Sequence, residues 1–225
     1  MKNKVAQINS RPFVTYTLLS LMVLVFVIMT IDGGTNNAAN LVRFGAKYNP
    51  LIQAGQWWRL ITPLFIHLSI THILFNGIAF YYMGIQLESL FGHSRFLLIF
   101  FISGIVGNLA SFAFNDDLSA GASTAIFGLF GAFMMIGETF WENPYVKQMT
   151  KSFVLFIILN LAFDLFSANI DIAGHLGGLV GGFLSAYFVG LPRKRFISLP
   201  RQIIATITLV IIALALFHLG YVGKY

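Results

Sequence analysis

The chain has 225 residues, of which 57% are hydrophobic and only 10% are Asp, Glu, Lys or Arg. Soluble domains carry about 25% charged residues, so this composition excludes an ordinary soluble enzyme. Cysteine is absent, which excludes disulfides, thiolate catalysis and thiolate metal sites, and the net charge of +6 has to be explained by where the basic residues lie.

Seven apolar runs with few or no charges follow one another along the chain. About 20 helical residues cross a hydrocarbon core of about 30 Å, so runs of this length predict membrane-spanning helices. The runs lack the apolar–polar alternation of barrel strands, and lipid then leaves only helices. The predicted helices cover residues 13–31, 63–83, 96–114, 122–137, 152–170, 172–191 and 202–222.

The first run, residues 13–31, has the position of a signal peptide but not its length. A signal core usually has about 7–15 apolar residues, and this run is longer, so we expect a retained signal anchor. The small residues Ala38 and Ala39 downstream leave cleavage open as the alternative.

The basic residues are distributed unequally between the two sides of the membrane. If the amino terminus lies in the cytoplasm, most of the 14 Lys and Arg residues fall in inner segments. This bias follows the positive-inside rule and predicts seven spans, with the carboxyl terminus outside. The positive charge therefore reflects topology, and we expect a lipid bilayer rather than a nucleic acid as the partner. The outer segments carry only Arg43, Lys47, Arg59 and Lys224.

Two predicted helices, the fourth and the sixth, carry small residues at helical spacing. Such stripes allow two helix backbones to approach closely in lipid. We therefore expect these two helices to pack against each other. The stripes are Gly121, Ala125, Gly128 and Ala132 on the fourth helix, and Gly174, Gly178 and Gly182 on the sixth.

Polar side chains interrupt the second, fourth and sixth helices, which all run from outside to inside in this topology. The fourth and sixth follow outer turns marked by Asp117 and Asp171. A rise of about 1.5 Å per residue places the polar groups of both helices roughly 6–9 Å below those turns. The polar residues that share this leaflet are His67, His72, Asn76, Ser123 and His175.

Each polar residue also has a purely structural interpretation. A lone serine such as Ser123 usually bonds to its own helix, and Asn76 is suited to hydrogen bonding between helices. An ionisable residue inside the membrane, such as His175, indicates function by default. We expect His67 to be exposed to water near the interface, and Glu88, at the inner boundary, to accept hydrogen bonds from helix-end or loop amides.

Taken together, four segments resemble the motifs of the rhomboid family of intramembrane serine proteases. They occur in the family's order, from the long outer loop through the sixth helix. The segments are Trp58-Arg59, the stretch from His67 through His72 to Asn76, Gly121-Ala122-Ser123, and Gly174-His175 through Gly178.

The resemblance implies an all-α polytopic membrane protein of the bacterial plasma membrane that cleaves transmembrane protein substrates near their outer ends, without a cofactor or metal. It implies a six-helix catalytic core at 13–191, to which this sequence adds a cytoplasmic tail at 1–12, a basic cytoplasmic linker at 192–201 and an additional transmembrane helix at 202–222. The implied roles are Ser123 as nucleophile, His175 as base, His72 and Asn76 at the oxyanion, Phe127 stacked on the base, Gly121 in the serine motif, Trp58 and Arg59 in the loop motif, and Glu88 as a structural carboxylate.

One residue departs from the family pattern, because Thr124 stands where many relatives have glycine. A β-branched residue there is expected to affect the approach of substrate rather than the chemistry. We interpret the site as a Ser-His dyad, since Asp171 is expected to lie in a solvated outer turn. A catalytically silent binder of membrane helices is the alternative; a transporter would be expected to show internal repeats, which are absent from the sequence.

Overall fold

The computed structural model describes residues 11–164, 170–192 and 197–223. Among these residues the structure is all-α, apart from one antiparallel bridge between Lys47 and Ser119. The long helices are α2 (Phe13–Ile31), α5 (Ile70–Phe91), α6 (His93–Phe114), α7 (Ser123–Thr139), α8 (Pro144–Asp164), α9 (Ile172–Val189) and α10 (Leu199–Val222). The outer loop holds α3 (Ala38–Phe44), α4 (Asn49–Gln53), η1 (Trp57–Leu60) and η2 (Thr62–Phe65).

Each predicted run corresponds to a long helix, but the bounds of the second and the fifth differ by more than one helical turn. The second helix was predicted to begin at residue 63, whereas α5 begins at Ile70, because Ser69 caps it by accepting a hydrogen bond from the His72 amide. The fifth was predicted at 152–170, whereas α8 begins at Pro144, and residues 165–169 lie outside the described residues. Most of the predicted tail and part of the predicted linker, residues 1–10 and 193–196, also lie outside them.

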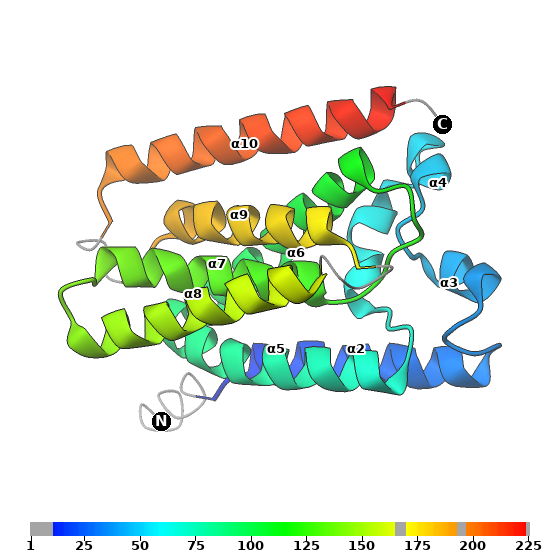
Figure 1. The fold of residues 1–225 in the computed structure, drawn as a ribbon, viewed down its shortest axis with the longest axis horizontal. Coiled ribbons are helices and arrows are strands. Elements are labelled where there is room, and N and C mark those ends of the chain that lie inside the picture. Colours follow the sequence, from blue (N-terminus) through cyan, green and yellow to red (C-terminus); the bar gives the residue numbers. More distant parts are fainter. Residues whose placement is uncertain (1–10, 165–169, 193–196, 224–225) are drawn as a thin grey trace, which may run out of the picture.

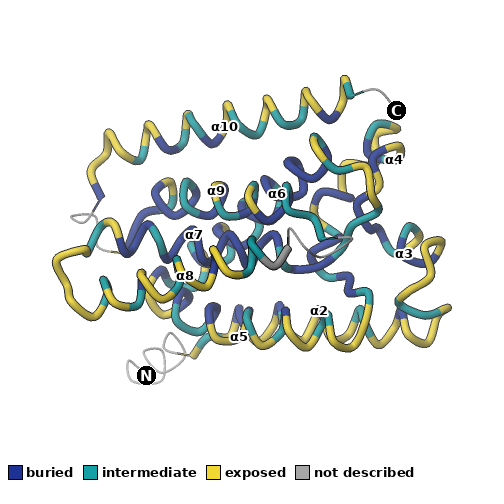
Figure 2. Tube along the Cα trace, viewed as in Figure 1, coloured by how far each residue is buried: buried dark blue, intermediate teal, exposed yellow. Residues whose placement is uncertain are grey.

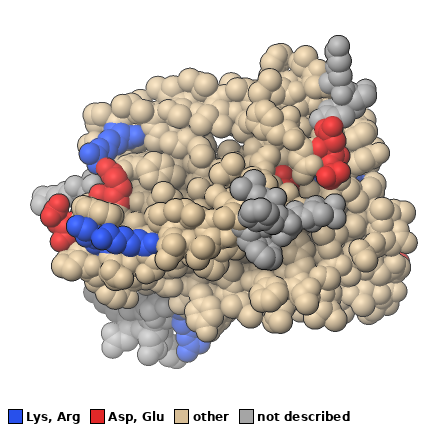
Figure 3. Space-filling model, in the orientation of Figure 1, with Lys and Arg blue, Asp and Glu red and all other residues tan. Residues whose placement is uncertain are grey.

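In the described part of the chain, four helices are long and apolar enough to cross a membrane: α2, α6, α9 and α10. Helix α7 is apolar but shorter. The seven-span topology therefore stays a prediction for α5, α7 and α8. On the face drawn in Figure 3, charged side chains lie toward the two ends of the long axis and leave an uncharged band between them.

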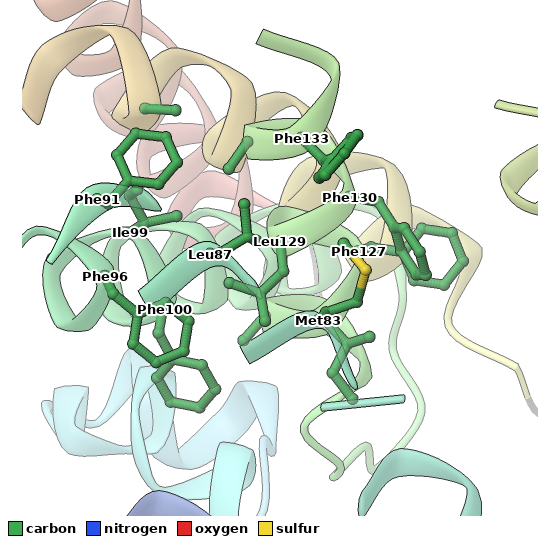
Figure 4. Close-up of a cluster of buried hydrophobic side chains, with 14 of the residues drawn as sticks. Met83, Leu87, Phe91, Phe96, Ile99, Phe100, Phe127, Leu129, Phe130 and Phe133 are labelled. Carbon is green, nitrogen blue, oxygen red and sulfur yellow. The ribbon is translucent and has the colours of Figure 1, made fainter. Parts of the chain in front are cut away.

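Helices α6, α7 and α9 form the centre of the molecule, as Figure 1 shows. Helices α2 and α5 run together along one side, α10 lies along the opposite side, and α8 packs on α7. Figure 2 shows burial concentrated in the central helices, with exposed positions along the outer helices. The aromatic and aliphatic core between α5, α6 and α7 is drawn in Figure 4.

The predicted packing of the fourth and sixth helices is confirmed by the glycines between α7 and α9. A Cβ atom built on Gly178 would lie 1.9 Å from the carbonyl oxygen of Thr124. A Cβ on Gly182 would lie 1.9 Å from the carbonyl oxygen of Gly128. Backbone therefore touches backbone at two successive turns, and only glycine allows this approach.

Glu88 fixes the start of α2 and is almost completely buried. Its carboxylate accepts hydrogen bonds from the amides of Val14 (3.0 Å) and Thr15 (2.8 Å) and from the Thr15 hydroxyl (2.6 Å). The first amides of a helix have no partner within it, so this carboxylate satisfies them. The expectation that Glu88 serves helix-end amides is confirmed, and His93 contacts the same carboxylate at 2.5 Å.

Candidate functional site

A cavity of about 990 Å³ opens between α5, α7 and α9. Its lining includes side chains that come from three separate stretches of the sequence. The sequence-predicted residues that line it are His72, Asn76, Ser123, Phe127 and His175. The polar groups predicted to share one leaflet thus face one common space, with the exception of His67.

Ser123 is the first residue of α7 and is half-buried at the cavity. The chain reaches it through Gly121, which has a φ of +138° and donates its amide to the carbonyl of Pro63 at 2.9 Å. A Cβ on Gly121 would lie 2.8 Å from His72 Nε2 and 3.6 Å from Asn76 Nδ2. Glycine is therefore required here both by the backbone conformation and by the close side chains.

His175 lies one turn into α9 and is 8% exposed. Its ring stacks on Phe127, with ring centroids 4.3 Å apart and planes inclined by 10°. The turn that carries it begins at Asp171, whose carboxylate accepts the amide of Gly174 at 2.9 Å and whose carbonyl accepts the amide of His175 at 3.0 Å. The stack on Phe127 thus holds the plane of the imidazole ring, and the Asp171 cap holds the start of α9.

His72 and Asn76 present hydrogen-bond donors beside Gly121. The amide of Leu68 donates to His72 Nδ1 at 3.4 Å. A neutral imidazole that accepts at Nδ1 carries its proton at Nε2, and Nε2 is the atom that lies next to Gly121. Asn76 Nδ2 is buried and has no hydrogen-bond partner within the described residues. Buried donors without partners are rare, so this amide group is available to a ligand.

Trp58 and Arg59 lie away from the cavity, in η1 of the outer loop. Trp58 is exposed, whereas Arg59 is only 5% exposed. The Arg59 guanidinium donates to the carbonyls of Val42 (2.8 Å) and Ala46 (3.0 Å) and to the Gln56 side chain (2.7 Å). Its role is therefore to hold the loop together, since the guanidinium fork finds several acceptors at once.

His67 was expected to be exposed to water, and this expectation is wrong. The side chain is completely buried, and its ring meets His72 edge-on with centroids 5.2 Å apart. Because α5 begins at Ile70 rather than at residue 63, His67 lies in the segment just before α5, where its ring packs against that of His72.

Thr124 was expected to affect the approach of substrate, but its side chain points elsewhere. It is 5% exposed and does not line the cavity. Its Cβ lies 2.7 Å from the position a Cβ on Gly107 would take, and its Cγ2 lies 3.0 Å from the equivalent position on Gly174. The β-branched side chain fills a notch left by glycines of α6 and α9.

Sequence reasoning missed three residues beside the site. Asp171 was expected in a solvated turn, yet it is half-buried, lines the cavity and accepts a hydrogen bond from Ser111 Oγ. Its position just before an apolar run is a helix-capping signal that the sequence does contain. Ser111 and Lys47, both completely buried, carry no local signal, because their partners lie far along the chain. Within the described ranges, no three His, Asp or Glu side chains are grouped as metal ligands.

Comparison with known proteins assigns the family. A Rhomboid domain model matches residues 54–192. The chain is 39% identical over 212 residues to rhomboid protease GluP of Bacillus subtilis, which covers 94% of this chain and 41% of GluP. It is 42% identical over 152 residues to Rhomboid-like protease 1 of Toxoplasma gondii, covering 65% of this chain and 52% of that protein. It is 38% identical over 165 residues to RHOMBOID-like protein 1 of Arabidopsis thaliana, covering 71% of this chain and 41% of that protein.

The chain therefore spans about two fifths to one half of the length of these relatives. The matched domain, by contrast, covers more than half of this chain and contains every residue of the cavity named above. With apolar helices long enough to cross a bilayer, the chain is an integral membrane protein, and it belongs to the rhomboid family.

Proposed function

We propose that this protein is an intramembrane serine endopeptidase that hydrolyses a peptide bond near the outer end of transmembrane helices in other membrane proteins. The observation that carries the proposal is one cavity lined by Ser123, His175 and the donors His72 and Asn76, in a chain whose relatives are named rhomboid proteases. A nucleophile, a base and oxyanion donors facing one space are the components that acyl transfer requires.

The reaction uses Ser123 and His175 as a dyad. His175 takes the proton of Ser123 Oγ as the oxygen attacks the peptide carbonyl, and it returns that proton to the leaving amine. Water then attacks the acyl-enzyme: His175 takes a proton from the water and returns it to Ser123 Oγ as the acyl group is released. The stack on Phe127 holds the imidazole in one plane, which limits the rotations that would carry it away from the serine.

The tetrahedral oxyanion is stabilised by three donors. They are the backbone amide of Ser123 in the first turn of α7, His72 Nε2–H and Asn76 Nδ2–H. Amides in a first helical turn lack intrahelical partners and favour negative charge. Removing one such donor typically costs about 3–4 kcal/mol of transition-state stabilisation. The absence of a side chain at Gly121 leaves room for the oxyanion beside both side-chain donors.

The substrate is a transmembrane helix that unwinds locally, because a hydrogen-bonded helix does not expose its carbonyls to attack. With the amino terminus in the cytoplasm and the carboxyl terminus outside, the first turns of α5, α7 and α9 lie toward the outer surface of a bacterial plasma membrane. Water reaches the site from that surface. The catalytic core comprises residues 13–191, and α10 is an additional helix beyond it.

Labelling of the purified full chain with a fluorophosphonate probe tests this function. An activated serine reacts with the probe, whereas a catalytically silent binder of membrane helices does not. We expect labelling at Ser123 in the folded wild type, and none in Ser123→Ala, in His175→Ala or after heat denaturation. A folded wild-type chain that remains unlabelled would refute the protease.

A further inference from the structure

A buried serine of α6 connects the two sides of the cavity. Ser111 is completely buried, and its hydroxyl donates a hydrogen bond to the carboxylate of Asp171, 60 residues away in sequence. The same hydroxyl lies 3.3 Å from Ser119 Oγ, which therefore donates to it, since Ser111 has only one hydroxyl proton. Ser111 thus contacts both the cap of α9 and the loop that leads to α7.

Asp171 connects Ser111 to the first turn of α9, which carries the proposed base His175. One carboxylate oxygen caps α9 by accepting the Gly174 amide, and the other accepts the Ser111 hydroxyl. The carbonyl of Asp171 accepts the amide of His175 at 3.0 Å. The first turn of α9, and with it the imidazole, is therefore tied to a fixed point on α6.

Lys47 holds the loop before α7, which leads to the nucleophile Ser123. The outer loop pairs with the loop before α7 through two backbone hydrogen bonds between Lys47 and Ser119, of 2.9 and 3.2 Å. The completely buried Lys47 ammonium also donates to the carbonyls of Asn115 (2.5 Å) and Asp117 (2.9 Å). Burial lowers the pKa of Lys47 to about 8, a shift that the neighbouring carboxylates, Asp171 foremost, oppose.

We infer that Ser111 and Asp171 are positioning residues, which set the distance between Ser123 and His175 by tying the loop before α7 to the first turn of α9. The inference rests on the proposed protease function. Neither residue takes part in proton transfer; their contribution is the placement of groups that do. Misplacement of reacting groups by about 1 Å can lower a rate about 100-fold, so loss of a contact that holds both groups in place has a large effect.

A matched pair of serine variants isolates the contact. Ser103 is also completely buried on α6, but within the described part of the chain its hydroxyl donates only to the carbonyl of Phe100 in its own helix. We expect Ser111→Ala to lower kcat on a membrane substrate about 10- to 100-fold at unchanged KM, and Ser103→Ala to remain within about twofold of wild type. Both are measured in the full chain, well below the Tm of each variant.

Two substitutions at Asp171 separate capping from positioning. Serine caps a helix well but is too short to reach Ser111, so Asp171→Ser should lose kcat as Ser111→Ala does. Asparagine retains both the cap and the reach, because its amide can donate to the Ser111 oxygen, so Asp171→Asn should keep activity within about threefold. The double variant Ser111→Ala/Asp171→Ser should be no slower than the slower single variant, since both remove one interaction.

The outcomes distinguish the inference from the function on which it rests. If the wild type is labelled by the fluorophosphonate but Ser111→Ala retains the kcat of Ser103→Ala, the positioning role is wrong and the protease stands. The positioning role is also wrong if, in both serine variants, the loss of kcat is simply proportional to the loss of Tm. An unlabelled wild type refutes the protease itself.

Discussion

One of the two closest contacts between α7 and α9 can be perturbed by one methyl group, in Gly178→Ala. A Cβ atom on this residue would lie 1.9 Å from the carbonyl oxygen of Thr124 and 2.8 Å from its carbonyl carbon. Real Cβ atoms essentially never come within 3.0 Å of a neighbour, so the two helices have to separate by about 1 Å. Both obstructing atoms belong to the backbone, and no side-chain rotation relieves the contact.

This separation acts directly on the proposed dyad. Thr124 follows Ser123, and Gly178 lies one turn after His175 on α9. A displacement of about 1 Å can cost about 100-fold in rate, so kcat/KM should fall by about two orders of magnitude. The cost in stability is smaller: overpacking costs about 1–3 kcal/mol, while alanine gains about 1 kcal/mol over glycine in helix propensity.

The assay is cleavage of a membrane substrate in proteoliposomes, together with the Tm of each variant. Gly77→Ala in α5 is the control, because among the described residues a Cβ there meets only Cδ1 at the end of the flexible Leu19 side chain, at 3.3 Å. We expect near wild-type kcat/KM in the control and a loss of about 100-fold in Gly178→Ala, with Tm lowered by a few degrees. Equal activity in the two variants would show that the α7–α9 contact does not set the active geometry.

Three further outcomes are expected. Asn76→Ala should lower kcat about 10²–10³-fold with little change in KM, because it removes one oxyanion donor; unchanged steady-state kinetics would remove Asn76 from the site. The pKa of Lys47 is about 8 in the folded protein, against 10.5 for the unfolded chain. Between these two values the unfolded state binds one more proton than the folded state. The free energy of unfolding of the wild type should therefore rise with pH across that window, by up to about 3 kcal/mol. Thermal unfolding from pH 7 to 10 should show this rise in wild type but not in Lys47→Met. Mass spectrometry of products in oriented vesicles should place the cut near the outer end of the substrate helix, and replacing Gly or Pro just inside the cut with Leu should slow cleavage; a cytoplasmic cut would refute the topology.

The apolar helices and one packing pair could be predicted from the sequence, because length, absence of charge and the spacing of small residues are local properties. The apolar run at 13–31 coincides with α2, since lipid-spanning length and absence of charge are properties of the run itself. The glycines of the sixth predicted helix indicated a close partner, and the contact of Gly178 with Thr124 is of that kind. The order and spacing of the motifs indicated which side chains would face one cavity.

The environment of single side chains was decided only by the tertiary structure. His67 and Arg59 have ordinary polar character in the sequence, yet both are buried, because the outer loop folds back on itself and supplies carbonyls and packing from distant residues. The hydrogen bond of Ser111 to Asp171 joins residues 60 positions apart, and that of Lys47 to Asn115 joins residues 68 apart. Periodicity and composition report the solvent preference of a segment, whereas burial and pairing of a polar group depend on which distant segment packs against it.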